Sequence, residues 1–351
     1  MKNRFRTQLV QINNDYNNRC YVPYSVGILR AYVEQNDQVR NNVEFLPFIF
    51  QRKPVREIVQ QIGETDMLAL SCYAWNWNLS MAIAEQVKQS QPKCLIVVGG
   101  PHIPERLGTF MNDYSMIDIA VQGEGEKTFE DLLLETIGNK RYENISGLSY
   151  RDPLTNQVFQ NPARPKITPI ETIPSPYLTG VFEDMMNTHC DIGWMALWET
   201  NRGCPFLCTF CDWGTGASKV RRFDMQRLLS EVDWFGERRI DYVFGCDANF
   251  GIFKRDLEIA EYLAKTKVEK GHPKEFRVCF AKNSTERIFR VARVLHDVDM
   301  SKGASLSMQS LNKDVLANIK RDNIRLTTYK ELMVMYADNA METFSEIIIG
   351  L

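Results

Sequence analysis

The chain has 351 residues, of which 44% are hydrophobic and 25% are charged, which is enough to build two domains with cores of their own. The 42 basic and 44 acidic residues give a formal net charge of -2, so the charge balance does not favour a nucleic-acid partner. The sequence shows no signal-peptide apolar region and no run long enough to span a bilayer, which favours a cytoplasmic enzyme without a membrane partner.

The first half alternates short apolar runs with helical patterns. Strands are predicted over residues 8–12, 43–48, 66–70, 94–98 and 117–121, and helices over 24–35, 54–62, 79–90 and 126–137. This alternation is typical of a parallel sheet covered by helices, an α/β fold. In such doubly wound sheets ligands bind at the carboxyl ends of the strands. We therefore expect a Rossmann-like cofactor-binding domain over residues 1–150.

Six of the 14 prolines fall between residues 150 and 180, which predicts a proline-rich linker over 151–190. The alternation then resumes, with strands over 193–200, 240–244, 276–280, 303–308 and 343–349 and helices over 225–238, 257–267, 286–298 and 328–338. These repeats predict a partial β/α barrel over 191–351, with an active site at the strand ends. Because the chain stops directly after a strand, we expect a barrel truncated at its C-terminus.

Three of the nine cysteines form the run Cys204-Pro205-Phe206-Leu207-Cys208-Thr209-Phe210-Cys211, directly after the first barrel strand. Three thiolates can hold an iron–sulfur cluster whose fourth iron has no protein ligand and is open to a substrate. A structural zinc site is the alternative, but it requires four protein ligands. The upstream His189 and Cys190 would lie at the wrong end of the intervening strand to complete it.

The motif Cys204-x-x-x-Cys208-x-x-Cys211, placed after the first strand of a β/α barrel, resembles the signature of the radical S-adenosylmethionine superfamily. The resemblance implies that the three cysteines hold a [4Fe-4S] cluster and that S-adenosylmethionine chelates the fourth iron through its amino and carboxylate groups. An electron from the cluster would cleave the sulfonium to a 5′-deoxyadenosyl radical, which abstracts hydrogen from an unactivated C–H bond. The resemblance also implies an electron donor such as flavodoxin or ferredoxin.

The same resemblance suggests where S-adenosylmethionine is bound. Phe210 would pack near the adenine, and Asp247 and Asn249, at the end of the second barrel strand, would bind the methionine amino group. Members of this superfamily more commonly carry Gly-Gly-Glu at this position. The alternative to a binding role for Asp247 and Asn249 is an ordinary turn with an asparagine cap. Contacts to the ribose and carboxylate of S-adenosylmethionine are expected from Ser305, Ser307 and Gln309 of the fourth strand. The alternative is that the serines are only small residues that fill space.

A Rossmann-like domain before such a barrel resembles the cobalamin-binding subfamily. Three loops carry the likeness: Ser71-Cys72-Tyr73-Ala74-Trp75-Asn76, Val97-Val98-Gly99-Gly100-Pro101-His102 and Val121-Gln122-Gly123-Glu124-Gly125-Glu126. The resemblance implies cobalamin contacts from Ser71, Tyr73, Trp75, Asn76, Gly99, Gly100, His102, Gly123, Glu124 and Gly125. Glycines let a backbone approach a cofactor closely. Glu124 and Glu126 also lie at a helix start, where acids favour the helix dipole.

The classical Asp-x-His-x-x-Gly motif for cobalt ligation is absent from the sequence. His102, the first domain's only histidine, is expected in a turn near the nucleotide tail or capping it, with cobalt ligation as the alternative. Without a histidine ligand, we expect Trp75 to cover the lower face of the cobalt. The alternative role for Trp75 is packing in the core or at an interface.

The resemblance as a whole predicts a class B cobalamin-dependent radical S-adenosylmethionine methyltransferase. Such an enzyme methylates an unactivated carbon of a small-molecule, natural-product or peptide substrate, using methylcobalamin and the adenosyl radical. One alternative is an enzyme that uses cobalamin for a rearrangement or cyclisation without methyl transfer. The other is a corrinoid or iron–sulfur carrier protein, which would cleave no S-adenosylmethionine. No segment identifies the substrate.

Overall fold

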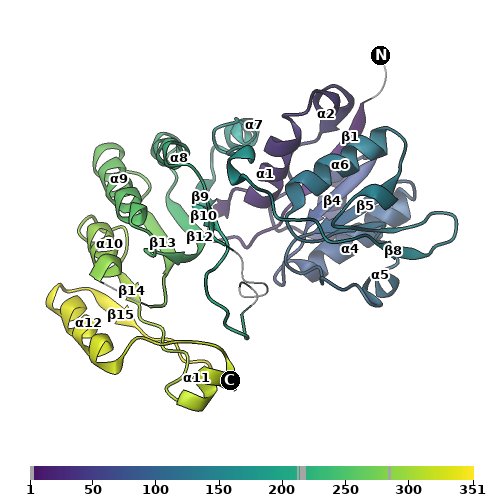
Figure 1. Cartoon of the computed structure of the whole chain (residues 1–351). Coiled ribbons are helices and arrows are strands. Elements are labelled where there is room, and N and C mark those ends of the chain that lie inside the picture. The colour runs from purple at the N-terminus through teal and green to yellow at the C-terminus, as the bar shows by residue number, and fades with distance from the viewer. Residues whose placement is uncertain (1–3, 212, 214–218, 284–285) are drawn as a thin grey trace. The chain divides into compact units, whose positions relative to one another are not determined.

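The computed structural model describes residues 4–211, 213, 219–283 and 286–351. The chain folds into two compact units, Met1–Ile192 and Gly193–Leu351 (Figure 1). Over the described ranges, none of the helices has both the length and the apolar character that crossing a membrane requires.

A seven-stranded sheet in the order β3-β1-β4-β5-β6-β7-β8 forms the first unit. Its strands are β1 (Phe5–Val10), β3 (Val43–Phe45), β4 (Met67–Ser71), β5 (Leu95–Gly99), β6 (Ile119–Val121), β7 (Leu148–Arg151) and β8 (Val158–Gln160). The strands from β3 to β6 pair in parallel, whereas β7 and β8 extend the sheet antiparallel. The strand order reverses between β1 and β4, and ligands of such sheets bind outside the carboxyl ends at this point.

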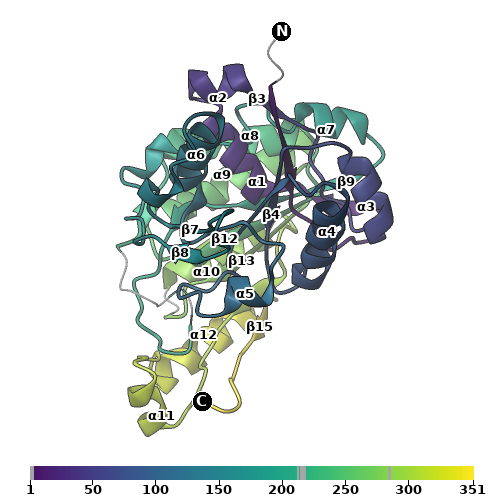
Figure 2. The ribbon, with the colours of Figure 1, turned by 90° about the vertical axis from the view of Figure 1, so that its right-hand side faces the viewer.

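Helices cover both faces of this sheet. Figure 2 shows β4 with α1 and α6 on one side and α3 and α4 on the other. The first unit contains α1 (Tyr24–Val33), α2 (Asp37–Asn42), α3 (Val55–Ile62), α4 (Trp77–Ser90), α5 (Phe110–Asp113), α6 (Gly125–Ile137) and α7 (Glu183–Thr188), with the short strand β2 (Arg19–Tyr21). All five residues of β4 are buried, because a parallel strand covered on both faces reads as one continuous apolar run.

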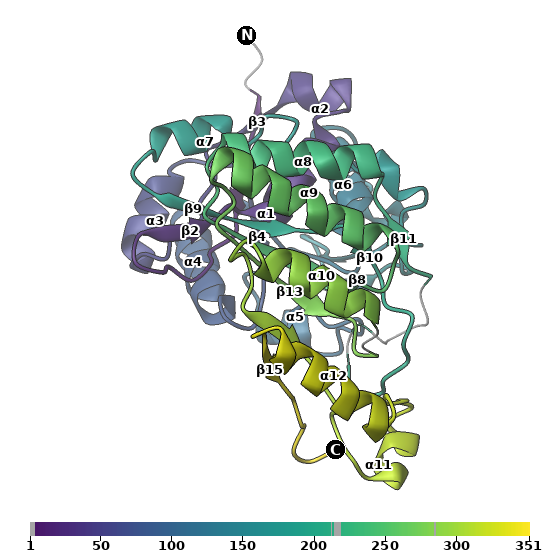
Figure 3. The ribbon, with the colours of Figure 1, turned by 90° about the vertical axis from the view of Figure 1, so that its left-hand side faces the viewer.

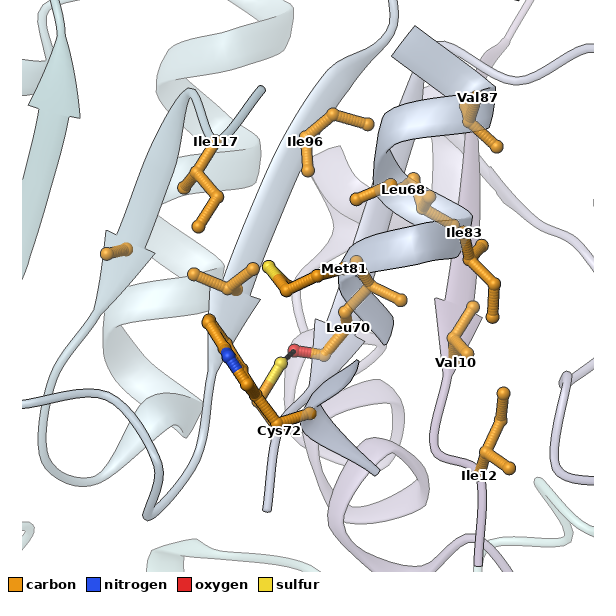
Figure 4. Close-up of a cluster of buried hydrophobic side chains, with 14 of the residues drawn as sticks. Val10, Ile12, Leu68, Leu70, Cys72, Met81, Ile83, Val87, Ile96 and Ile117 are labelled. Atoms are coloured by element: carbon orange, nitrogen blue, oxygen red, sulfur yellow. Dashed lines mark hydrogen bonds between the residues drawn. The ribbon is translucent and has the colours of Figure 1, made fainter. Parts of the chain in front are cut away.

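The core between the sheet and α4 is built from side chains that alternate along the strands. Leu68 and Leu70 of β4 and Ile96 of β5 point toward Met81 and Ile83 of α4 (Figure 4). These side chains are buried, and each contributes about 1.5–3 kcal/mol of transfer free energy when fully removed from water. This packing fixes the strand ends from which the site loops emerge.

The proline-rich stretch 151–190 belongs to the first unit. It contains β8, α7 and buried side chains such as Ile173 and Phe182. A Cβ atom placed on Gly27 of α1 would lie 2.2 Å from the Phe182 ring, so α1 packs directly against this stretch. The expectation of an all-parallel sheet is wrong at one end, where β7 and β8 pair antiparallel. Their short, partly polar sequences do not show the apolar pattern of a strand.

The second unit repeats strand and helix. β9 (Gly193–Trp198), β12 (Tyr242–Phe250) and β13 (Glu275–Phe280) pair in parallel, and β14 (Gly303–Ser305) pairs in parallel with β15 (Glu342–Phe344). The intervening helices are α8 (Met225–Glu237), α9 (Arg255–Lys270), α10 (Glu286–His296), α11 (Lys313–Asn318) and α12 (Leu326–Asp338). Figure 3 shows α8, α9, α10 and α12 side by side. The predicted α/β fold, a doubly wound unit followed by a partial β/α barrel, is confirmed.

Candidate active site

The cysteine loop leaves the second unit's sheet through a short ribbon. β10 (Asn201–Arg202) pairs antiparallel with β11 (Arg221–Arg222), so the two ends of the loop lie side by side. Gly203, which precedes Cys204, has a φ of +109°, a conformation that favours glycine. Cys204 and Cys208 are only 8% and 6% exposed, whereas Cys211 is partly exposed.

The loop carries three thiols on a tight backbone. The N–H of Cys211 donates to the carbonyl oxygen of Cys208 at 3.1 Å. Within the described ranges, no three His, Cys, Asp or Glu side chains are arranged as ligands of one metal ion. The three cysteines therefore lie on one loop but do not form a site for a single metal ion.

Asn249, at the end of β12, reaches this loop. Its Nδ2 donates to Sγ of Cys204 at 3.1 Å, and the side chain is 5% exposed. Its Oδ1 is buried and has no hydrogen-bond partner in the structure. Because soft thiolates on a short loop are the ligands of iron–sulfur clusters, and a donor at sulfur stabilises the thiolate, these residues fit such a group.

Asp247 is engaged by the chain itself. Its Oδ1 accepts from the backbone N–H groups of Thr200 and Asn201 at 2.8 and 3.2 Å. Its Oδ2 accepts from the Thr200 hydroxyl and from Nδ2 of Asn201. Burial raises the pKa of Asp247 to about 7, although these hydrogen bonds favour the charged form. The carboxyl group expected to bind an amino group thus ties the end of β12 to the residues that lead into the cysteine loop.

Three further contacts hold the loop. Arg255 donates to the carbonyl oxygen of Thr200 at 2.8 Å, and the N–H of Thr209 donates to the carbonyl oxygen of Ile319 at 3.1 Å. The Lys282 ammonium lies 5.7 Å from the centre of the Phe210 ring. Phe210 therefore has a cationic neighbour at the end of β13.

A polar chain lies at the ends of β14 and β15. The hydroxyl oxygens of Ser305 and Ser307 are 2.7 Å apart, and Ser307 donates to the carboxylate of Glu346 at 2.7 Å. Gln309 is buried with a φ of +62°, an uncommon conformation for a residue other than glycine. Its N–H donates to the carbonyl oxygen of Glu346 at 2.9 Å. Glu346 was missed, although it is the one acid in the apolar run 343–349.

In the first unit, the loop after β4 is closed by Asn76. Its Nδ2 donates to the carbonyl oxygens of Ile12 and Ser71 at 3.1 and 2.9 Å, and its Oδ1 accepts from the N–H of Tyr73 at 2.7 Å. Trp75 stacks on Tyr73 with ring centroids 4.5 Å apart. Since Trp75 is 51% exposed, the loop presents a flat aromatic surface at the reversal point of the sheet.

The loop after β5 approaches the loop after β4 closely. Gly100 has a φ of +106°, and a Cβ atom there would lie 2.7 Å from the carbonyl oxygen of Cys72, so another residue would clash. The N–H of Cys72 in turn donates to the carbonyl oxygen of Gly99 at 2.7 Å. His102 is exposed on this turn, and its ring lies 4.6 Å from that of Trp77.

The loop after β6 is open. Gly123 has a φ of +75°, and nothing lies within 4 Å of a Cβ atom built there. Glu124 accepts from the N–H of Ile167 at 2.8 Å, and a Cβ atom on Gly125 would lie 3.2 Å from Leu29. An aromatic face after β4 and an uncovered glycine turn after β6 fit a large planar cofactor.

Comparison with known proteins gives matches for both units. A family of B12 binding domains matches residues 19–133, and the radical SAM superfamily matches residues 198–351. The chain is 44% identical over 335 residues to 2-(S-pantetheinyl)-carbapenam-3-carboxylate methyltransferase of Streptantibioticus cattleyicolor. It is 41% identical over 335 residues to the cobalamin-dependent radical SAM methyltransferase TokK of Streptomyces tokunonensis.

Each alignment covers 94% of this chain and 49% of the relative, so the chain spans about half the length of these curated relatives. The solved structure of the cobalamin-dependent S-adenosylmethionine radical enzyme OxsB has the same fold. Its TM-score is 0.73 at 16% identity, over 99% of this chain and 49% of that chain. Two matched domains in this order, with the cysteine motif inside the second, show that the chain belongs to the cobalamin-binding radical S-adenosylmethionine enzyme family.

Proposed function

We propose that the protein is a class B cobalamin-dependent radical S-adenosylmethionine methyltransferase, which replaces a hydrogen on an unactivated carbon of a small molecule by a methyl group. The observation that carries this proposal is 44% identity, over 94% of the chain, to a methyltransferase. We assign residues 1–150 to the cobalamin-binding domain, 191–351 to the radical S-adenosylmethionine domain, and 151–190 to a connecting segment that packs on the first unit.

The second unit would hold the cluster and S-adenosylmethionine. The cluster ligands are Cys204, Cys208 and Cys211, and the unpartnered Oδ1 of Asn249 accepts a hydrogen bond from the amino group of S-adenosylmethionine. The remaining contacts to S-adenosylmethionine come from Phe210, Ser305, Ser307 and Gln309. When bound, the cluster supplies the electron that cleaves S-adenosylmethionine, and cobalamin carries the methyl group. Asp247 acts through the backbone of Thr200 by fixing the base of the loop.

The first unit would hold cobalamin on its three loops. The exposed Trp75, stacked on Tyr73, would cover the corrin ring and exclude water from it. The open turn at Gly123 would let the backbone approach the cofactor, and Gly100 would contribute through the close packing of its loop against Cys72. The remaining predicted contacts are Ser71, Asn76, Gly99, His102, Glu124 and Gly125, and Asn76 contributes by shaping its loop.

The relatives support a proposal for the substrate class. One of them is named for a carbapenam carboxylate that bears a pantetheinyl thioether, so we propose a small carboxylate-bearing natural product of this kind. Reducing electrons would come from a flavodoxin or ferredoxin, and the enzyme would work in the cytoplasm.

The test is turnover by the anaerobically reconstituted protein with S-adenosylmethionine, a reductant and 2-(S-pantetheinyl)-carbapenam-3-carboxylate. Each methyl transfer should consume two molecules of S-adenosylmethionine, giving one S-adenosylhomocysteine from the methyl donor and one 5′-deoxyadenosine plus methionine from the cleaved molecule. The product should gain the mass of one methyl group in place of a hydrogen. Cys208→Ala should abolish the cluster absorbance and the 5′-deoxyadenosine, while Cys190→Ala, at an exposed thiol outside the loop, should preserve both.

The other outcomes separate the alternatives. Formation of 5′-deoxyadenosine with a product that has gained no methyl group would identify a rearrangement or cyclisation. A reconstituted protein that forms no 5′-deoxyadenosine at all would be a carrier, and full cleavage by Cys208→Ala would remove the assignment of the cysteines.

A further inference from the structure

The side-chain amide of Asn249 links the end of β12 to a cysteine sulfur. Its Nδ2 is 3.1 Å from Sγ of Cys204, and both residues are buried. Cys204 itself is one of the three predicted cluster ligands. A buried amide in contact with a ligand atom can change the electronic properties of the group that this atom holds.

The donor side of this contact is fixed by the chain around it. Phe250, next to Asn249, is fully buried and pairs with Phe280 of β13. The N–H groups of Gly251 and Phe253 both donate to Oδ2 of Asp256, at 2.8 and 2.9 Å. The backbone is thus held directly after Asn249, at the end of β12.

The acceptor side is fixed by Asp247, which lies on the same strand as Asn249. The carboxyl group of Asp247 binds the backbone N–H groups of Thr200 and Asn201, and the ribbon from Asn201 to Arg222 closes the loop. Cys204 follows this anchored segment directly. Because Asp247 and Asn249 lie on the same strand end, β12 both carries the donor and anchors the segment that leads to Cys204, so the fold sets the short N–H···S distance.

Hydrogen bonds to cluster sulfurs are one of the levers that set the reduction potential of an iron–sulfur cluster. Reduction adds an electron to a cluster that already carries thiolate charge, so a donor at sulfur stabilises the reduced form more than the oxidised form. Burial strengthens the effect because less water competes for the sulfur.

We propose that Asn249 donates an N–H···S hydrogen bond to Cys204 when Cys204 ligates the cluster, and thereby raises the reduction potential of that cluster. The inference rests on the proposed function, since it needs the cluster to be present. Asn249 is here a positioning and tuning residue that acts through Cys204.

The experiment compares the wild-type protein with Asn249→Leu, which has a similar size and no donor, and Asn249→Asp, whose carboxylate accepts but does not donate. Each protein is reconstituted anaerobically, its iron and sulfide are quantified, and its midpoint potential is measured by redox titration followed by electron paramagnetic resonance, without S-adenosylmethionine. Both variants should have a lower potential. A tenfold shift of the reduction equilibrium corresponds to about 59 mV for a one-electron couple. Asn312→Ala, which removes an exposed side chain that caps α11, should leave the potential unchanged.

A second measurement uses only the wild-type protein and therefore does not depend on the folding of a variant. Wild-type protein labelled with [15N]asparagine should show a 15N coupling to the reduced cluster in pulsed electron paramagnetic resonance. Equal potentials in proteins with equal iron content, or no 15N coupling in the wild type, would overturn the inference and leave the proposed function intact. A wild-type protein that assembles no [4Fe-4S] cluster would instead remove the proposed function, and this inference with it.

Discussion

Asp247 holds Thr200 at two points, with Oδ1 accepting from the Thr200 backbone N–H at 2.8 Å and Oδ2 accepting from the Thr200 hydroxyl. This pair joins the end of β12 to the chain that leads into the cysteine loop. Asp247→Ala would leave these buried donors without acceptors, so we expect the free energy of unfolding to fall by about 3 kcal/mol. Asp247→Asn keeps the size of the side chain and one oxygen acceptor. The loss in free energy of unfolding should therefore be clearly smaller for this variant. Urea denaturation measures both, and equal losses would contradict a role through hydrogen bonding.

The same carboxyl group predicts a pH dependence of stability. Burial raises the pKa of Asp247 to about 7 in the folded protein, whereas an aspartate in an unfolded chain titrates near 3.9. The folded state therefore binds the proton more tightly, and the free energy of unfolding should fall as the pH rises from about 4 to about 7. One proton changes it by at most about 1.4 kcal/mol per pH unit. Asp247→Asn should flatten this slope, and parallel wild-type and variant profiles would argue against the raised pKa.

Gly100→Ala should destabilise the first unit. The added Cβ atom would lie 2.7 Å from the carbonyl oxygen of Cys72 at a φ of +106°, so both a clash and backbone strain oppose it. We expect a loss of about 3 kcal/mol. Gly271→Ala is the matched control, because Gly271 has a φ of +75° with nothing within 4 Å, and backbone strain alone costs about 1 kcal/mol. Thermal and urea unfolding of the two variants measure the difference, and equal losses would show that the contact with Cys72 can relax.

Trp75→Ala tests the proposed cobalamin surface. Because Trp75 is 51% exposed and rests mainly on Tyr73, its removal should change the stability of the apo protein by no more than about 1 kcal/mol. The affinity for cobalamin should fall about tenfold, which equals about 1.4 kcal/mol, and Trp75→Phe should retain most of it. Titration of the visible cobalamin bands measures the affinity. Unchanged binding by Trp75→Ala would place the corrin ring elsewhere.

The repeated α/β pattern could be predicted because burial on both faces makes strands continuous apolar runs. β4 and β5 were predicted to within a few residues for this reason. β7 and β8 could not be found, since strands of only four and three residues, partly exposed at the antiparallel end of the sheet, show no clear apolar pattern. The helix α11 was missed because its six residues show no repeating apolar face.

The site was predictable where it is local in sequence. The spacing of Cys204, Cys208 and Cys211 lies within one loop and needs no tertiary knowledge. The partners of Asp247 and the link between Ser307 and Glu346 join segments far apart along the chain, so only the folded structure reveals them. The assignments of individual residues to S-adenosylmethionine and cobalamin stay predictions.

The hydrogen bond from Thr209 to Ile319 has a consequence for biosynthesis. Thr209 lies inside the cysteine loop, whereas Ile319 follows α11, late in the second unit. A nascent chain that has not yet delivered Ile319 lacks this tether, although all three cysteines have already left the ribosome. The loop can therefore reach its final form only after Ile319 has left the ribosome, and delivery of iron and sulfide is best timed after that point.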